Sequence, residues 1–313
     1  MTAPDIGSAR QLPDAPGAIF LDHIGHFVAD HDAAAAALAA LGFTPTPWTV
    51  QTNPDPEGGA PKLTGTGNHC VMFRNGYLEV LAKTAETPLS RQLDQAMARY
   101  RGVHLIAFGT RDAVNERARL AAAGFAGQPM VDLRRKVDDE TGAEVELAFS
   151  VARVVPEAME EGRIQFLTHR TEQAMWQPQM LDHPNGAESL TDQVVLVADL
   201  EQANQRWERF LARPSTPVAC GRLFRLERGR ITLCAAEHAA MAAPIALPEA
   251  PVMAAYGIGV ADLAPVRGCL ERSGMRPVDE AAGRLTVAFP EALGTGVLHF
   301  LTAEAHPPWL RGA

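Results

Sequence analysis

The stretch FLDHIGHFVADHDAAAAALAALGF, residues 20–43, decides the fold. A short apolar run comes first, and Asp30, an alanine-rich segment and Gly42 follow it. Aspartate is a preferred helix N-cap because its carboxylate accepts hydrogen bonds from the free N–H groups of the first turn. Glycine often ends a helix because it adopts positive φ easily. The stretch therefore predicts a strand, a turn at Asp30, and a helix that ends at Gly42.

The same order of features recurs three more times along the chain, and such internal repetition predicts a repeated structural unit. The third copy lacks the closing glycine. The copies are VHLIAFGTRDAVNERARLAAAGF at 103–125 with Asp112 and Gly124, QVVLVADLEQANQRWERFL at 193–211 with Asp199, and YGIGVADLAPVRGCLERSGM at 256–275 with Asp262 and Gly274.

Further strand patterns follow each helix. In the first copy, apolar runs at 69–73 and 77–82 flank Arg74-Asn75-Gly76. Asn-Gly between apolar runs is a strong signal for a β-hairpin. The unit is thus a strand, a helix and about three more strands, and four repetitions favour it over a generic α+β chain. The later pairs of runs are 144–151 with 163–168, 222–226 with 230–234, and 285–289 with 296–301.

Composition and charge limit the partners and the location of the chain. It has 313 residues, 47% of them hydrophobic, and a formal net charge of -9. A negative balance argues against binding to nucleic acid, which requires a basic surface. No apolar run approaches the roughly 20 residues of a membrane helix. The four cysteines form no CxxC pair. We expect a cytoplasmic protein with a small-molecule substrate, no nucleic-acid partner and no membrane partner.

Four polar residues lie in strands that otherwise resemble buried ones. His23 and His104 open the first strands of copies one and two, and Glu79 and Gln165 occupy matching places in their last strands. Burying a carboxylate without a partner destabilises the fold by roughly several kcal/mol, even after the surroundings relax. A divalent cation shared with imidazoles removes that cost. The four residues together therefore predict a metal site, although a single strand histidine is more often a hydrogen-bonded core residue and Glu79 alone could be an edge-strand charge.

These residues also carry a resemblance to a known family. The chain resembles the vicinal oxygen chelate superfamily, and within it the glyoxalase-like domain proteins of bacteria. In that family, βαβββ modules pair into half-open barrels around a metal, with ligands from the first and last strands. The resemblance therefore implies an α+β fold of four βαβββ modules in two half-open barrel domains. The segments that carry it are Leu21-Asp22-His23-Ile24, Val28-Ala29-Asp30, Leu41-Gly42-Phe43, Gly65-Thr66-Gly67-Asn68 and Tyr77-Leu78-Glu79.

The resemblance implies a metal site and a domain plan. Its ligands would be His23, Glu79, His104 and Gln165, although Gln165 departs from the carboxylate found in many such sites. It covers residues 18–170, expected to form the metal-binding domain. A linker at 171–189 and a degenerate second domain at 190–306 would follow.

The second half retains no comparable set of ligands. Its first strands offer Gln193 and either Tyr256 or Gly257, and its last strands offer Thr232 and His299. We expect this half to bind no metal and to complete the pocket, cover the first half or support a homodimer.

The predicted site suits chelation of two neighbouring substrate oxygens by a divalent metal, namely Zn, Mn, Fe, Co or Ni. The expected activity is that of a glyoxalase-type lyase or isomerase acting on a small α-oxygenated carbonyl compound. Glu79 or His169 would move the proton, and a hydrogen-bonding role at the rim is an equal alternative for His169. Two rival interpretations are an iron-dependent extradiol-type dioxygenase and a non-catalytic binding or resistance protein.

Overall fold

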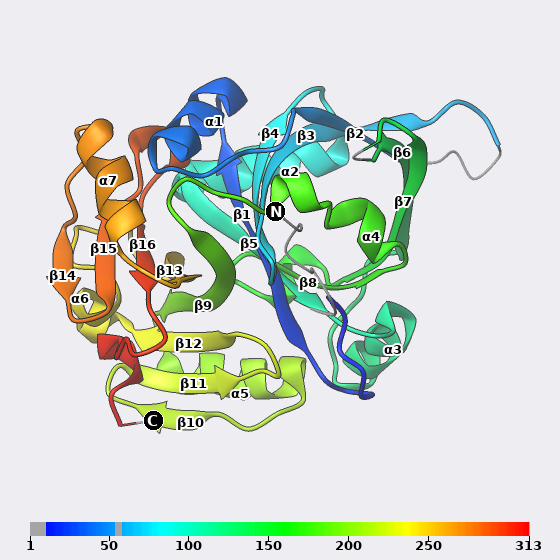
Figure 1. The fold of residues 1–313 in the computed structure, drawn as a ribbon. Coiled ribbons are helices and arrows are strands. Elements are labelled where there is room, and N and C mark those ends of the chain that lie inside the picture. Colours follow the sequence, from blue (N-terminus) through cyan, green and yellow to red (C-terminus); the bar gives the residue numbers. More distant parts are fainter. Residues whose placement is uncertain (1–10, 54–57, 140, 313) are drawn as a thin grey trace.

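The computed structural model describes residues 11–53, 58–139 and 141–312. Its first two βαβββ units make up the N-terminal half of the chain (Figure 1). The first unit is β1 (Phe20–Val28), α1 (His31–Ala40), β2 (Thr49–Asn53), β3 (Lys62–Met72) and β4 (Tyr77–Lys83); the second is β5 (Gly102–Gly109), α3 (Ala113–Ala122), β6 (Val131–Asp138), β7 (Glu144–Arg153) and β8 (Arg163–His169).

The C-terminal half repeats this order. An unpredicted helix, α2 (Pro88–Arg99), joins the first two units, and the short helix α4 (Glu172–Met175) precedes the third. The third unit is β9 (Ala187–Val197), α5 (Leu200–Leu211), β10 (Thr216–Val218), β11 (Gly221–Arg225) and β12 (Arg230–Ala235); after α6 (Ala239–Ala242), the fourth is β13 (Val252–Val260), α7 (Ala264–Arg272), β14 (Asp279–Ala281), β15 (Arg284–Ala288) and β16 (Val297–Leu301).

The predicted helix N-caps are confirmed in three units, and in the fourth the N-cap is the next residue along the chain. The carboxylates of Asp30, Asp112 and Asp199 accept hydrogen bonds from backbone N–H groups in the first turns of α1, α3 and α5. Asp262 lies one residue before the cap of α7, so the prediction is wrong by one position. Because Pro265 in the first turn has no N–H, the Asp262 carboxylate accepts instead from the first residue of the helix, at 3.0 Å.

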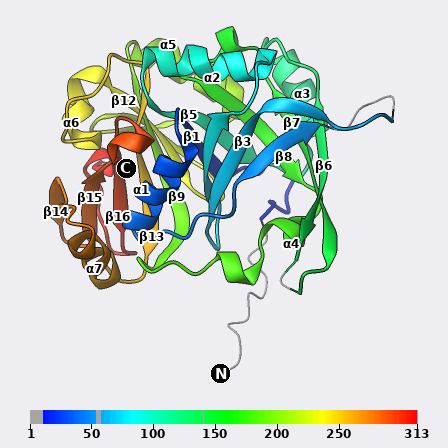
Figure 2. The same cartoon turned by 90° about the horizontal axis from the view of Figure 1, so that it is seen from above.

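Each half of the chain forms a half-open barrel, as the family resemblance implies. In the first half, β1 pairs in parallel with β4, and β3 and β2 follow; β5, β8, β7 and β6 repeat this order. The antiparallel pair β1–β5 joins the two units. The outer strands β2 and β6 contact each other without forming a ladder, so the sheet is not closed. Figure 2 shows β3 near the centre of the view and β6, β7 and β8 to its right.

The second half has the same plan around the antiparallel pair β9–β13. A bridge between Val103 in β5 and Met253 in β13 links the two barrels into a single sheet, which has sixteen strands in the described part of the chain. His26 is buried where the barrels meet. Its Nδ1 lies 2.9 Å from the Leu293 carbonyl oxygen and its Nε2 3.3 Å from the Tyr256 hydroxyl. Among the described residues, no helix is both long and apolar enough to cross a membrane.

Candidate functional site

The first barrel encloses a cavity of about 80 Å³ between its two units. Three of the four predicted metal ligands line it: His23 from β1, Glu79 from β4 and Gln165 from β8. The strands place Glu79 and Gln165 equivalently, because Glu79 pairs with Gly25 on β1 and Gln165 pairs with Ala107 on β5. The residue-for-residue match between the two last strands therefore corresponds to a real structural match.

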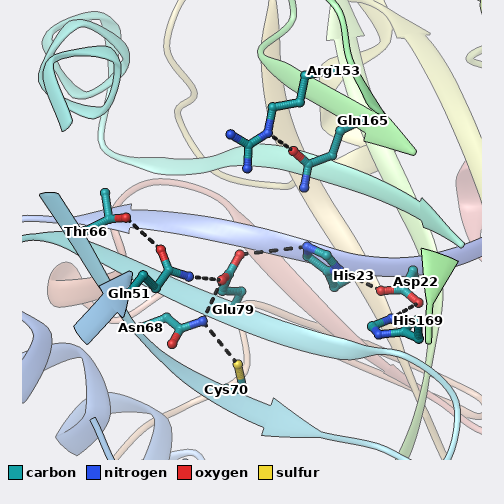
Figure 3. A network of polar contacts seen from close by, with 10 residues as sticks. All are labelled: Asp22, His23, Gln51, Thr66, Asn68, Cys70, Glu79, Arg153, Gln165 and His169. Carbon is teal, nitrogen blue, oxygen red and sulfur yellow. Dashed lines mark hydrogen bonds and ion pairs between the residues drawn. The ribbon is translucent and has the colours of Figure 1, made fainter. Parts of the chain in front are cut away.

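His23 is held by a buried carboxylate that the sequence did not reveal. Its Nδ1 lies 2.7 Å from Oδ1 of Asp22, whose Oδ2 lies 3.0 Å from Nε2 of His169 (Figure 3). Asp22 has no partner on β5, because Leu21 pairs with Phe108 and His23 with Ala107. It is thus the extra residue of a β-bulge. A β-bulge changes the direction of a side chain, so the side chains of the neighbouring residues Asp22 and His23 can lie in one hydrogen-bond network here.

The ionisation of Asp22 fixes the hydrogens of this network. Burial by itself raises the pKa of Asp22, but the charge and hydrogen bond of His169, followed by those of His23, outweigh it and hold that pKa well below its usual value. An ionised carboxylate only accepts hydrogen bonds. His23 therefore donates through Nδ1, and His169 donates through Nε2. The remaining nitrogen of His23, Nε2, is left to face the cavity.

Glu79 lies opposite that nitrogen. Its Oε2 is 3.8 Å from Nε2 of His23. Its Oε1 accepts hydrogen bonds from Nδ2 of Asn68 at 2.7 Å and from Nε2 of Gln51 at 3.4 Å. Tyr77 stacks on the imidazole of His23 with ring centres 4.3 Å apart. The carboxylate is 7% exposed and its direction is set by two amides.

The chemistry of this pair suits a cation. When His23 is neutral with its hydrogen on Nδ1, its Nε2 presents a lone pair toward a carboxylate oxygen of Glu79, and the two acceptors then have no hydrogen between them. A divalent cation or a proton relieves that arrangement. The Asp22–His23 hydrogen bond also matches the carboxylate–histidine arrangement that orients metal-ligating imidazoles. His23 and Glu79 therefore fit as two donors to a metal.

Gln165 lines the cavity but is engaged elsewhere. Its Oε1 accepts a hydrogen bond of 2.9 Å from Nε of Arg153 (Figure 3). The amide oxygen could join a metal only by releasing that guanidinium. Arg153 was not singled out from the sequence, since an arginine at the end of an apolar strand is usually solvated.

His104 does not belong to this cavity, so the prediction that it joins His23 and Glu79 is wrong. It is the bulge residue of β5, because Gly25 pairs with Leu105 and His26 with Val103. Leu105 holds in β5 the place that His23 holds in β1, and it lines the cavity. The sequence comparison was off by one residue, a shift that redirects a side chain because strand positions alternate.

His104 instead lines a second cavity of about 290 Å³, which shares Arg153 and Arg163 with the first. Its Nε2 lies 2.7 Å from the Tyr100 carbonyl oxygen, and its ring stacks on that tyrosine with centres 3.9 Å apart. Burial lowers the pKa of His104 to about 4. A neutral imidazole held by a backbone carbonyl is a structural element of the fold here.

His169 is also outside the lining of the first cavity. It is buried at the end of β8, edge-to-face with Trp176 at 4.8 Å, and its Nε2 contacts Asp22, which holds His23. This placement does not support a general base in direct contact with substrate. It supports a residue that positions Asp22 and, through it, His23.

Three arginines border the first cavity. Arg135, Arg153 and Arg163 line it, whereas Glu79 is its only acidic lining residue within the described chain. Burial and the nearby charge of Arg153 lower the pKa of Arg163 to about 9, although Glu79 opposes this, so Arg163 stays charged at neutral pH. Among the described residues, neither Arg153 nor Arg163 forms an ion pair within 4.0 Å. The cavity is therefore positively charged.

Comparison with known proteins agrees with this geometry. A family model described as a glyoxalase-like domain matches residues 21–211, more than half of the chain. The chain belongs to the glyoxalase-like domain family. This places it in the vicinal oxygen chelate superfamily, as its sequence resemblance implies, and members of that superfamily usually bind a divalent metal. No curated protein sequence matches the chain.

Solved structures share the fold of this glyoxalase-like protein at low sequence identity. A hypothetical protein from Staphylococcus aureus has a TM-score of 0.61 at 11% identity, covering 91% of this chain and 99% of its own. A mutant of 4-hydroxymandelate synthase from Streptomyces coelicolor has a TM-score of 0.60 at 14% identity, covering 94% and 96%. A xylose isomerase-like TIM barrel/4-hydroxyphenylpyruvate dioxygenase fusion protein scores 0.53 at 11% identity, covering 96% and 52%.

The second barrel of this glyoxalase-like protein replaces the site with other contacts. Asp192 in β9 forms two hydrogen bonds with Arg230, of 2.7 and 2.6 Å. His299 in β16 lies 2.8 Å from the Ala242 carbonyl oxygen and 2.9 Å from a threonine hydroxyl. Trp309 packs against His299 at 4.4 Å and is fully buried. Asp192 and His299 therefore already have protein partners in this barrel.

Proposed function

We propose that this protein is a metal-dependent enzyme of glyoxalase type that acts on a small, anionic α-oxygenated carbonyl compound. One observation carries the proposal: Nε2 of His23, turned inward by Asp22, faces the Glu79 carboxylate at 3.8 Å in the cavity of the first barrel. His23 and Glu79 would hold the metal. Two protein donors leave several coordination positions for substrate oxygens and water.

When bound, the metal supplies Lewis-acid stabilisation of negative charge that develops on the oxygens of an enediolate. The residues of the chain orient the metal ligands and move the proton. Asp22 keeps His23 in one tautomer and orientation. Glu79, held by Asn68 and Gln51, is the carboxylate placed to take a proton from the carbon next to the carbonyl. His169 supports Asp22 from the side away from the cavity.

The three arginines that line the cavity are the reason to propose an anionic substrate. Among the described lining residues, Arg135, Arg153 and Arg163 outnumber the one carboxylate, that of Glu79. Guanidinium groups bind carboxylate and phosphate groups through paired hydrogen bonds. A substrate such as a 2-oxo or 2-hydroxy carboxylate would neutralise this excess charge. It would also bring two neighbouring oxygens toward His23 and Glu79.

A dioxygenase is the second candidate, favoured by the similarity to 4-hydroxymandelate synthase along 94% of the chain. His23 and Glu79 would then be two members of an iron-binding triad. The absence of a third histidine beside them in the described cavity makes this candidate weaker, because Leu105 occupies that position. A binder without catalysis is the remaining alternative.

The test combines metal analysis with exchange of the carbon-bound hydrogen. Purified protein would be loaded with Zn²⁺, Mn²⁺, Co²⁺, Ni²⁺ or Fe²⁺ and incubated in D₂O with a panel of 2-oxo and 2-hydroxy carboxylates, with exchange followed by proton NMR. We expect metal-dependent exchange that Glu79→Gln abolishes. Glu116→Gln is the matched control, a buried glutamate paired with Arg119 outside the cavity. Oxygen uptake with Fe²⁺ and no hydrogen exchange would favour the dioxygenase. Ligand binding without any metal would overturn both proposed enzyme activities.

A further inference from the structure

A second cluster of metal-binding side chains lies outside the cavity, between the start of α1 and strand β3. His31, Asp32 and His69 each bring a ligand atom to within 4.8 Å of the others. We propose that these three residues bind a divalent transition-metal ion at a site separate from the His23–Glu79 centre. This goes beyond the proposed function and does not depend on it.

His69 has the hydrogen-bonding pattern of a metal ligand. It is 7% exposed, and its Nδ1 lies 2.7 Å from the Thr46 carbonyl oxygen. A carbonyl only accepts, so Nδ1 carries a hydrogen, and in the neutral imidazole Nε2 then carries a lone pair. That Nε2 is buried and has no hydrogen-bond partner. Buried polar atoms are nearly always satisfied, so this nitrogen requires an explanation. A carbonyl partner on the far nitrogen is also the usual support of a metal-ligating imidazole.

His31 presents a second unpartnered nitrogen to the same place. Its Nδ1 is buried, forms no hydrogen bond, and lies 3.3 Å from Oδ1 of Asp32. The imidazole stacks on Trp48 with ring centres 3.8 Å apart and planes within 9°. The ring centres of His31 and His69 are 5.6 Å apart. Since a ligating imidazole has its centre about 3 Å from the metal, this spacing suits two rings that share one ion.

The charges near the cluster decide whether a cation is tolerated at the start of a helix. The α1 dipole places about half a positive charge at this end, which opposes a cation. The carboxylates of Asp30 and Asp32 lie in the same turn and outweigh it. Asp32 is 88% exposed, so its side chain is free to complete the coordination, and water can take the remaining positions.

The donor set indicates the class of metal. Two imidazole nitrogens and one carboxylate suit Zn²⁺, Co²⁺, Ni²⁺ or Cu²⁺, whereas Mg²⁺ and Ca²⁺ prefer oxygen ligands. The bound ion would tie the first turn of α1 to β3. Trp48 lies against both imidazoles, with its ring centre 5.1 Å from that of His69. A paramagnetic ion at this site should therefore quench the fluorescence of Trp48.

The experiment titrates chelator-treated, full-length protein with Co²⁺ and follows tryptophan fluorescence together with bound metal. We expect the wild type to bind Co²⁺ with quenching, and His69→Gln to lose one equivalent, the quenching and at least tenfold in affinity. Asp32→Asn, a surface change that cannot prevent folding, should weaken binding by several-fold. Trp48→Phe should keep the metal and lose the quenching.

His23→Gln distinguishes the two sites. It should leave the quenching intact, whether or not the cavity binds metal, because it touches none of the three proposed ligands. The proposal is overturned if His69→Gln and Asp32→Asn bind Co²⁺ and quench like the wild type. It is also overturned if chelator-treated wild type binds no Co²⁺. A proton shared by His31 and Asp32 would then take the place of the metal between them. Circular dichroism of each variant separates loss of metal from loss of fold.

Discussion

The Asp22 carboxylate accepts a 2.7 Å hydrogen bond from Nδ1 of His23, and this bond decides which imidazole nitrogen faces the cavity. Both residues are neighbours in β1, where successive side chains would normally diverge. The bulge at Asp22 brings them to one network. The orientation of the candidate metal ligand thus depends on a residue that contributes no ligand itself.

Asp22→Asn should weaken metal binding in the cavity by about 10–100-fold, the usual effect of losing the partner of a ligating imidazole. The asparagine keeps the volume of Asp22 but presents an amide to two imidazoles. Isothermal titration with Zn²⁺ measures the change. The control is Asp192→Asn, which breaks the pair with Arg230 in the second barrel. An unchanged affinity for Asp22→Asn would show that His23 needs no such orientation.

The register of β5 predicts opposite outcomes for two neighbouring substitutions. Leu105→His should raise the metal affinity of the cavity by about tenfold or more, because Leu105 occupies the place equivalent to that of His23. His104→Leu should leave metal binding in the cavity unchanged. Metal titration of both variants checks this, and the reverse pattern would restore His104 as a ligand.

Arg135→Gln should raise KM for an anionic substrate by about 10–100-fold with a smaller effect on kcat, because Arg135 is a half-buried lining residue and losing a guanidinium–anion contact in a cavity costs about 2 kcal/mol. Arg134→Gln is the matched control on the same strand. It is exposed and paired with Glu146. An unchanged KM in Arg135→Gln would assign anion binding to other residues.

His26 makes the stability of the chain sensitive to moderately acidic pH. Burial lowers its pKa from 6.5 to about 4 in the folded state, only partly offset by its hydrogen bond to Leu293. Between these values the unfolded chain binds more protons, so stability falls as the pH drops from about 6.5 toward 4. At pH 5 the loss from this one histidine is about 2 kcal/mol.

Urea denaturation at pH 7.5 and pH 5 measures that loss. His26→Gln, which keeps an N–H donor for the Leu293 carbonyl, should show a smaller difference between the two pH values than the wild type. His299, whose pKa burial also lowers to about 4, should continue to contribute in that variant. Equal differences in the two proteins would show that His26 does not titrate in this range.

Local sequence determined the repeated unit and part of the site. Asp30, Asp112 and Asp199 cap their helices because capping involves only neighbouring backbone groups. Glu79 and Gln165 were matched correctly because each lies at the same distance from the turn that precedes its strand. Such short-range relationships can be read from the chain.

Tertiary structure decided which side chains meet. One bulge brings Asp22 to His23, and another puts Leu105 where His104 was expected, because a single extra residue reverses the alternation of a strand. The partners of these residues, His169 and Tyr100, come from other elements and could not be assigned by spacing alone. The sequence by itself determined four modules and pointed to His23 and Glu79 as candidate metal ligands. Only the packing of β1 against β5 decided which residues share the cavity.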